Sequence, residues 1–208
     1  MSGSPVARPP RRPAVGLVLR PGRASEAPEL TALALRSKGF WGYSASFMRA
    51  VTGELTLDAE TAPRTVVAEV DGELAGFHLL LDPMPAAPVD PAAPEAPAAS
   101  EASAAPATTA TPVSGELDML YVDPQFIGTG LGRLLFEDAR RAAVQRGWDR
   151  MLVQADPQAQ LFYERLGAVP VGERLSPSIP GRALPLLAVP LRRTAGGSVG
   201  AARAGYWR

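Results

Sequence analysis

The chain has 208 residues, 46% of them hydrophobic, and its 21 basic and 21 acidic residues cancel to a formal net charge of zero. This length is sufficient for one domain whose core folds alone, and the charge balance excludes a general attraction to nucleic acid or to an anionic membrane. With no cysteine and one histidine, disulfides, thiolate sites and His-rich metal sites are excluded too. We therefore expect no metal, no nucleic-acid partner and no membrane partner.

The two ends of the chain are expected to be unstructured. Residues 1–13 form a Pro- and Arg-rich tail, and residues 193–208 form a flexible one. Residues 1–16 lack the apolar stretch of a secretory signal, and no apolar run in the chain approaches the ~20 residues of a membrane helix. We expect a cytoplasmic protein, and the abundance of Ala, Pro and Arg suggests a bacterial source.

The first elements are a strand and two helices. Residues 16–20 (GLVLR) are typical of a strand. Residues 25–38 predict a helix with Ser25 as its cap, and residues 44–52 predict a second, shorter helix.

A β-hairpin follows. Residues 65–70 (TVVAEV) and 73–81 (ELAGFHLLL) predict two strands, because Asp71-Gly72 between them is a strong two-residue turn signal. The hairpin places both strands in one sheet.

Residues 83–114 read as a disordered insert. Within residues 83–112, eight prolines and twelve alanines occupy twenty of the thirty positions, so the segment has little to bury and cannot offset its ordering entropy. Residues 116–122 (ELDMLYV) predict the next strand of the same sheet. The insert is therefore an enlarged loop inside one domain over residues 14–192, and the cost of closing such a loop grows only slowly with its length.

The second half alternates between helices and strands. Residues 131–146 carry apolar side chains at helical spacing, and Gly147 ends that helix. We expect a helix over residues 157–166 that begins at Pro157, and strands over residues 150–155, 168–174 and 184–189. The whole is a mixed α/β sheet with helices on its faces.

The stretch YVDPQFIGTGLGRLLFEDA, residues 121–139, carries the clearest chemical signal. A strand ends, and Gly128, Gly130 and Gly132 leave backbone amides uncovered where a long helix begins, which is a site for a phosphate or pyrophosphate. A Walker loop requires Gly-Lys-Ser/Thr, whereas Arg133 follows the last glycine, and the GxGxG spacing does not fit a dinucleotide fingerprint. A flexible turn before a Gly-capped helix is the alternative.

Two blocks resemble the GNAT superfamily of N-acetyltransferases. VDPQFIGTGLGRLLFEDA resembles the Q/R-x-x-G-x-G signature, with Gln125, Gly128 and Gly130 at the signature positions. DPQAQLFYERLGA, residues 156–168, resembles the N-x-x-A-x-x-F-Y-x-x-x-G-F block, with Asp156 in place of Asn and Ala168 in place of Phe. The segments 34–48 and 171–185 resemble a bacterial subgroup whose substrates are unassigned.

The resemblance implies the GNAT fold, which is α/β with a mixed, mostly antiparallel central sheet flanked by helices, and acetyl-CoA as the acyl donor. Main-chain groups at the end of the fourth strand face pantetheine and the thioester, and the glycine loop and the following helix face the pyrophosphate. The residues implied in donor binding are Leu120, Tyr121, Val122, Gln125, Phe126, Ile127, Gly128, Thr129, Gly130, Leu131, Gly132, Arg133, Asp156, Ala159 and Phe162.

Two residues are catalytic candidates. The resemblance makes Tyr163 a general acid for the departing thiolate, and we expect proton delivery to follow from reference pKa values of ~10 for the phenol and ~8.5 for a thiol; packing against the sheet is the alternative role. Glu116 is the candidate base, because an alkylamine of pKa ~10.4 is mostly protonated at neutral pH; a solvated strand end is its alternative. His78 is a further possible base, and a structural histidine with its hydrogen bonds satisfied is its alternative.

Four residues are candidates for binding the acceptor. Asp118 shares a strand face with Glu116. Trp41 and Tyr43 lie in a loop between the first two helices, and Arg182 lies in a loop between the last two strands; in this fold those loops border the acceptor site. A small satellite core is the alternative for the two aromatic residues, and plain exposure is the alternative for Arg182.

The function expected is transfer of an acetyl group from acetyl-CoA to a primary amine of a small molecule or peptide, by direct attack in a ternary complex. A non-catalytic acyl-CoA-binding module of the same fold is the alternative, and an interaction protein that uses the Pro/Ala insert ranks below both. We expect a monomer or a homodimer.

Overall fold

The computed structural model describes residues 16–83 and 112–191. The tails expected at 1–13 and 193–208 lie outside the described residues, as does most of the insert expected at 83–114. One boundary of that insert is wrong, because Ser114 already belongs to a strand.

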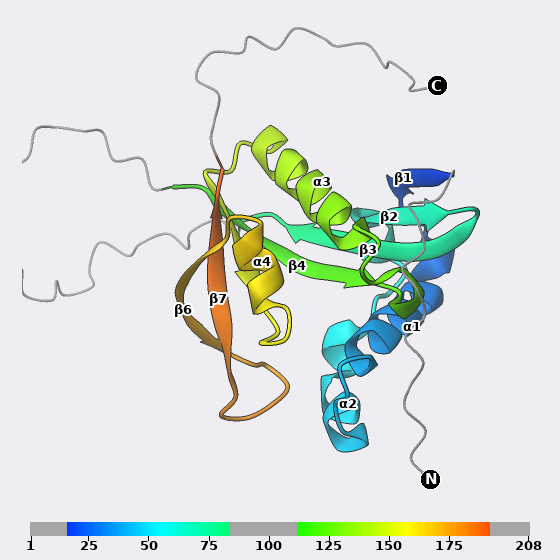
Figure 1. Cartoon of the computed structure of the whole chain (residues 1–208), viewed down its shortest axis with the longest axis horizontal. Coiled ribbons are helices and arrows are strands. Elements are labelled where there is room, and N and C mark those ends of the chain that lie inside the picture. Colours follow the sequence, from blue (N-terminus) through cyan, green and yellow to red (C-terminus); the bar gives the residue numbers. More distant parts are fainter. Residues whose placement is uncertain (1–15, 84–111, 192–208) are drawn as a thin grey trace, which may run out of the picture.

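The described residues form one seven-stranded sheet in the order β1-β2-β3-β4-β5-β7-β6 (Figure 1). Neighbouring strands are antiparallel except β4 and β5, which are parallel. The strands are β1 Leu17–Pro21, β2 Thr65–Val70, β3 Glu73–Leu81, β4 Ser114–Val122, β5 Arg150–Gln154, β6 Val169–Leu175 and β7 Ala183–Pro190. The mixed, mostly antiparallel sheet expected from the sequence is thereby confirmed.

The hairpin between β2 and β3 shows how a local signal determines register. Val70 pairs with Glu73, and the two residues between them, Asp71 and Gly72, have φ of 52° and 85°. Two consecutive positive φ values define the turn whose twist matches that of the strands it joins. Both strands therefore begin and end as the sequence predicts.

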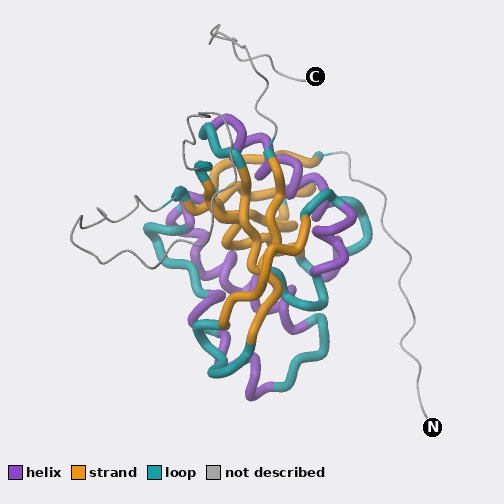
Figure 2. The backbone as a smooth tube through the Cα atoms, turned by 90° about the vertical axis from the view of Figure 1, so that its left-hand side faces the viewer, coloured by secondary structure: helices purple, strands orange, loops and turns teal. Residues whose placement is uncertain are grey.

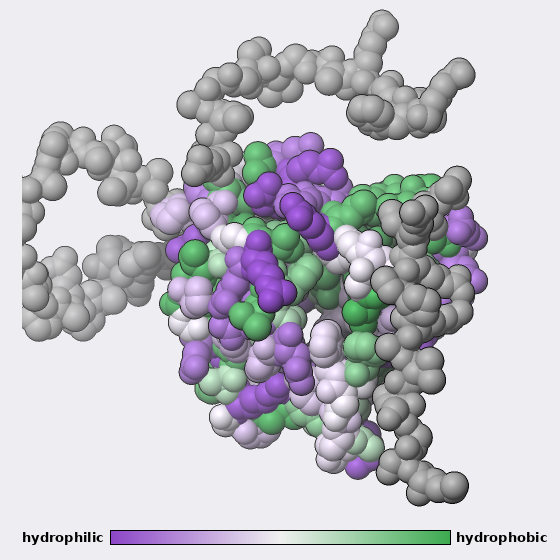
Figure 3. Space-filling view, in the orientation of Figure 1, coloured by the Kyte–Doolittle hydropathy of each residue, from purple (hydrophilic) through white to green (hydrophobic). Residues whose placement is uncertain are grey.

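Helices cover both faces of the sheet (Figures 1 and 2). On one face, α1 Ala27–Gly39 buries Leu30 and Leu33 in a cluster with Phe77 of β3, and α2 Ala45–Val51 adds Val51 to it. The other face carries α3 Leu131–Gln145 and α4 Gln160–Arg165. Hydrophilic side chains cover the outer surface of α3 (Figure 3), while its buried side turns Leu135 and Phe136 to the sheet. None of the helices among the described residues has the length and apolar character that crossing a membrane requires.

Two predicted helix starts are wrong. A 3-10 turn at Ala24–Glu26 precedes α1, and its buried Glu26 accepts from the backbone N–H of Arg23 at 2.9 Å, so Ser25 is no cap. The last helix begins at Gln160 rather than at Pro157, because the Asp156 carboxylate accepts from the backbone N–H of Gln158 at 2.9 Å and turns the chain first.

Candidate active site

A cleft opens where β4 and β5 separate. Their parallel pairing runs from Ser114↔Arg150 only to Glu116↔Leu152. Beyond that point the strands diverge around a cavity of about 510 Å³, which is also lined by α1, by the loop before α3 and by α4. β4 divides it into a donor half on the α3–α4 side and an acceptor half on the α1–α2 side.

The donor half is formed by the chain between β4 and α3. Gly128 and Gly130 have φ of 83° and 93°, and Gly130 precedes the first residue of α3 without any side-chain cap. The first amides of α3 are therefore directed outward at the positive end of the helix dipole, which is the geometry of an anion-binding site. An added Cβ at either glycine meets no atom within 4 Å, so the loop leaves open space over these amides.

Most of the predicted donor residues line the cleft. They are Leu120, Tyr121, Val122, Phe126, Ile127, Gly128, Gly130, Gly132, Arg133, Asp156, Ala159 and Phe162. Three others lie elsewhere: Leu131 is buried beneath the loop, the Thr129 hydroxyl donates to the Phe126 carbonyl at 2.7 Å, and Gln125 borders a neighbouring groove.

An ion pair that the sequence did not reveal holds the start of the loop. Asp123 accepts from the backbone N–H of Gln125 and begins the 3-10 turn Pro124–Phe126. The Nε and Nη2 atoms of Arg36, on α1, donate to Oδ2 of Asp123 at 3.0 and 2.7 Å. The loop is thus anchored to the opposite side of the sheet.

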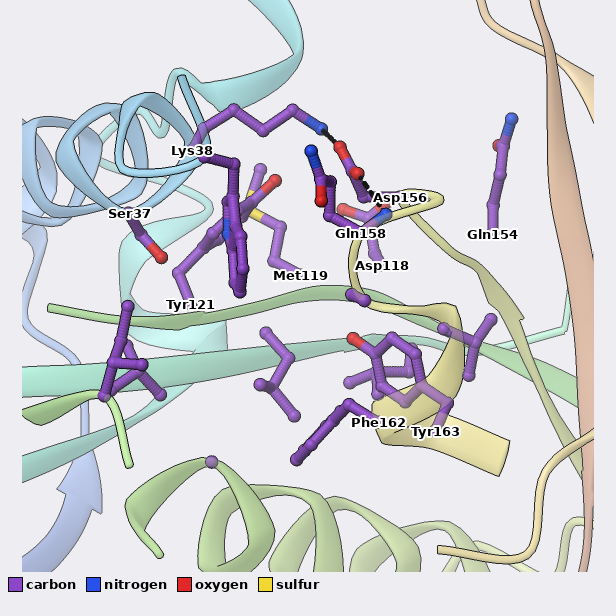
Figure 4. A pocket seen from close by; sticks show the side chains of 18 of the residues that line it. Ser37, Lys38, Asp118, Met119, Tyr121, Gln154, Asp156, Gln158, Phe162 and Tyr163 are labelled. Carbon is purple, nitrogen blue, oxygen red and sulfur yellow. Dashed lines mark hydrogen bonds and ion pairs between the residues drawn. The ribbon is translucent and has the colours of Figure 1, made fainter. Parts of the chain in front are cut away.

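Tyr163 lies at the inner end of the cleft. The residue is only 7% exposed. Its ring packs against the rings of Phe136 and Phe162, with centroid distances of 5.8 and 5.0 Å. The hydroxyl points toward β4 (Figure 4), and it has no hydrogen-bond partner within residues 16–83 and 112–191. Burial raises the pKa of Tyr163 well above its ordinary value, and the charge of Asp156 adds to the rise.

A β-bulge places a carboxylate in the cleft. Leu79 pairs with Met119 and Leu80 with Leu117, so Asp118 is left without a partner on β3 and opens into the cavity. Desolvation in the cleft raises the pKa of Asp118, and the neighbouring charge of Glu116 raises it further.

Glu116 lines the same cavity but is already paired. Its Oε1 accepts from Arg174 of β6 at 2.6 Å. The structure thus brings both predicted carboxylates to one side of the cleft, and gives only one of them a cationic partner.

The acceptor half is closed by a cluster around Asp156 (Figure 4). Lys38, from the last turn of α1, donates to Oδ2 of Asp156 at 2.5 Å, and the Tyr43 hydroxyl lies 2.7 Å from Oδ1. Burial opposes ionisation of Asp156, but the hydrogen bonds from Lys38, Tyr43 and the Gln158 backbone outweigh it and lower its pKa. Asp156, which replaces the Asn of the family pattern, therefore forms an ion pair with a lysine that the sequence analysis did not identify.

The other acceptor candidates divide into two groups. Trp41 is 42% exposed and lines the cleft. Tyr43 and Arg182 do not line the cleft and pack together on Phe47 instead. The Tyr43 ring stacks on the Phe47 ring with centroids 4.2 Å apart, and the Arg182 guanidinium lies 4.6 Å from the Phe47 ring centroid. Burial raises the pKa of Tyr43, with Asp156 adding to the rise and Arg182 opposing it.

His78 does not reach the cleft. It is 2% exposed, faces α3, and its Nε2 lies 2.9 Å from Oδ2 of Asp138. It is not among the residues that line the cavity, so its position favours a structural role over a role as base. It is not a fully satisfied histidine, because its buried Nδ1 has no hydrogen-bond partner among the described residues.

The model of the acetyltransferase (GNAT) family matches residues 29–168, more than half of the chain. No curated protein matches the chain by sequence. Solved structures do: a GCN5-related N-acetyltransferase from Rhodopseudomonas palustris is 22% identical, with a TM-score of 0.59 over 86% of this chain and 98% of its own.

Two further structures show the same likeness. The PaiA N-acetyltransferase of Thermoplasma acidophilum, in complex with coenzyme A, is 14% identical with a TM-score of 0.55 over 85% of this chain and 99% of its own. The ribosomal-protein-S18-alanine N-acetyltransferase of Escherichia coli is 18% identical with a TM-score of 0.52 over 88% of this chain and 99% of its own. At these identities the likeness shows the fold. The family match goes further: the chain belongs to the GNAT acetyltransferase family, and it is an acyl-CoA-dependent N-acyltransferase whose donor is acetyl-CoA.

Proposed function

We propose that the protein moves the acetyl group from acetyl-CoA directly to a primary amine while both are bound. The observation that carries this proposal is the cleft between β4 and β5, which has the unpartnered Tyr163 hydroxyl at its inner end and the carboxylates of β4 on its acceptor side. Acetyl-CoA supplies an activated acetyl group in the form of a thioester. The residues of the chain bind it, accept a proton from the amine and stabilise the sulfur that leaves.

Donor binding depends mainly on the backbone. The free amides at Gly130 and the start of α3 would hold the pyrophosphate, and Arg133 adds a positive charge at the rim of the cleft. The main chain of Leu120, Tyr121 and Val122, where β4 has left its parallel neighbour, would pair with pantetheine. Backbone contacts of this kind place the thioester between the two halves of the cleft.

The amine must lose a proton before it attacks, because only the neutral form carries a lone pair. Asp118 is the better of the two carboxylates for this step: its pKa is raised, and it has no cationic partner among the described residues. Glu116 is paired with Arg174, and its negative charge raises the pKa of Asp118 further. We therefore assign the base to Asp118, with Glu116 beside it.

Tyr163 acts on the leaving sulfur, but not as the reference pKa values suggest. A phenol of pKa ~10 does not fully transfer its proton to a thiolate of pKa ~8.5 at equilibrium, and burial widens the gap. The expectation of simple delivery is wrong on this point. The hydroxyl instead donates a hydrogen bond as negative charge develops on sulfur, which is an electrostatic contribution to the transition state.

Tyr163→Phe tests this assignment. The variant keeps the ring between Phe136 and Phe162 and removes only the hydroxyl. We expect single-turnover rates to fall by about 100-fold, the usual loss for one such donor, while CoA affinity measured by calorimetry changes less than about threefold. A rate loss under about threefold, with an unchanged melting temperature, would leave Tyr163 as a packing residue only.

A further inference from the structure

The acceptor half of the cleft holds carboxylates that form no salt bridge with any described residue. Four carboxylates line the cavity: Glu54, Glu116, Asp118 and Asp156. Asp156 is paired with Lys38 and Glu116 with Arg174. Glu54 and Asp118 remain without a salt bridge among the residues that the structure describes.

Glu54 and Asp118 act on each other. Glu54 belongs to the 3-10 turn Gly53–Leu55, and its Oε1 accepts from the Ser178 backbone N–H at 2.9 Å, a neutral partner. Its charge is one of those that disfavour ionisation of Asp118, whereas the charge of Arg64 acts in the opposite direction. A cation bound between the two carboxylates would relieve this repulsion.

The geometry points to an organic cation. No group of three or more His, Asp or Glu side chains in the described part of the chain is arranged to hold a metal ion. Tyr163, which is 7% exposed, turns its hydroxyl into the same cleft without a hydrogen-bond partner among the described residues, and this is a second sign of a ligand site. An amine acceptor with a second ammonium group supplies the missing positive charge.

The enclosure of the acceptor half favours a small molecule over a protein chain. Lys38 and Asp156 join α1 to the start of α4. Glu54 and Ser178 join the 3-10 turn to the loop between β6 and β7. These contacts bound the acceptor side of a cavity whose whole volume is about 510 Å³, part of which the pantetheine arm must occupy.

We propose that the acceptor is a small aliphatic di- or polyamine, with Glu54 as the residue that binds the ammonium group that does not react. This rests on the proposed function. One ammonium group loses a proton to Asp118, which passes it on to solvent, and the neutral amine then attacks the acetyl carbon. As the C–N bond forms and the C–S bond breaks, the nitrogen loses its second proton, and the sulfur leaves as the thiolate. That second proton converts the thiolate into the free thiol. The other nitrogen stays protonated, as its reference pKa of ~10.4 requires, and pairs with Glu54.

The test compares acceptors that differ by one amino group. Free-thiol release is followed with acetyl-CoA and α,ω-diaminoalkanes of three to six carbons, each against the n-alkylamine of the same length. We expect kcat/KM for at least one diamine to exceed that of its monoamine by about tenfold or more, as for a charge pair removed from bulk water. Glu54→Gln keeps an oxygen for the Ser178 N–H and should bring the diamine-to-monoamine ratio close to one. Glu60→Gln, at an exposed carboxylate outside the cleft, should keep the wild-type ratio.

The outcomes separate the two levels of inference. Equal turnover of diamines and monoamines by the wild type, or a ratio untouched in Glu54→Gln, overturns the diamine proposal and leaves the acetyltransferase mechanism standing. Turnover of peptides in preference to every diamine overturns it as well. Bound CoA with no thiol release from diamines, monoamines or peptides overturns the proposed function together with this acceptor class.

Discussion

The two halves of the cleft are built in different ways. The donor half comes mostly from one continuous stretch, from Leu120 to Arg133, and its binding groups are mainly backbone amides at the start of α3. The acceptor half collects side chains from segments far apart in the chain, since Lys38 meets Asp156 and Glu116 meets Arg174. A backbone site depends on local conformation, which glycines encode within a few residues. A side-chain site depends on how the whole sheet folds, which short motifs do not encode.

The largest expected effect tests the donor half at its backbone. Gly130→Glu puts a negative side chain where the free amides of α3 face a pyrophosphate. We expect CoA affinity, measured by calorimetry, to fall at least about 100-fold, or about 2.7 kcal/mol.

Gly130→Ala is the matched control. Its φ of 93° is as unfavourable for Ala as for Glu, so the two variants share the backbone strain and differ in charge and bulk. Equal affinities of Gly130→Ala and Gly130→Glu would show that conformation, and not an anion site, is the function of this loop.

A smaller effect is expected from the ion pair that closes the acceptor half. The Lys38 and Asp156 side chains are only 15% and 14% exposed, so Lys38→Met leaves a largely buried carboxylate unpaired. We expect the free energy of unfolding in urea to fall by about 1–3 kcal/mol, below the full cost of breaking a buried pair. Arg140→Met, which removes the exposed pair with Glu137, should cost under about 1 kcal/mol.

The same variant sharpens the comparison between the halves. If Asp156 serves the acceptor half, Lys38→Met should change CoA affinity by less than about threefold. A large loss of CoA affinity would instead show that Asp156 contacts pantetheine, as the Asn at this position does in the family pattern. Adding Asp156→Asn to Lys38→Met should restore part of the lost stability, because it removes the unpaired charge.

The sequence predicted what local chemistry determines. The bounds of β2 and β3 follow from the Asp71-Gly72 turn, and the loop before α3 follows from its glycines. The errors come from tertiary contacts. Pro157 was expected to begin α4, but the Asp156 carboxylate turns the chain before the helix can start.

Within the site, the sequence favoured Glu116 as the base because it could not show the guanidinium of Arg174 beside it. It also gave Lys38 no role, since a lysine in the last turn of a helix is usually explained by the helix dipole alone. Only the fold places Lys38 within 2.5 Å of a carboxylate 118 positions further along the chain. Charge partners of this kind have no signature in one sequence.

The smallest effect concerns His78, the single histidine of the chain, which lies under α3 and outside both halves of the cleft. Burial lowers the pKa of His78 below its ordinary value of 6.5, although Asp138 opposes the shift. The native state then binds the proton less readily than the unfolded state does, so stability is complete above pH 6.5 and declines as pH falls toward the native pKa. The slope is at most about 1.4 kcal/mol per pH unit, and we expect a loss of about 1 kcal/mol between pH 7 and 5.5 in urea unfolding.

His78→Gln should flatten this dependence, and the lone imidazole signal in a proton NMR titration should give a pKa below 6.5. A value above 6.5, with stability rising toward acid, would mean that the Asp138 pair outweighs burial. In either case the acid limb of turnover should persist in His78→Gln, because the proposed base is Asp118 in the cleft and not the histidine behind the sheet.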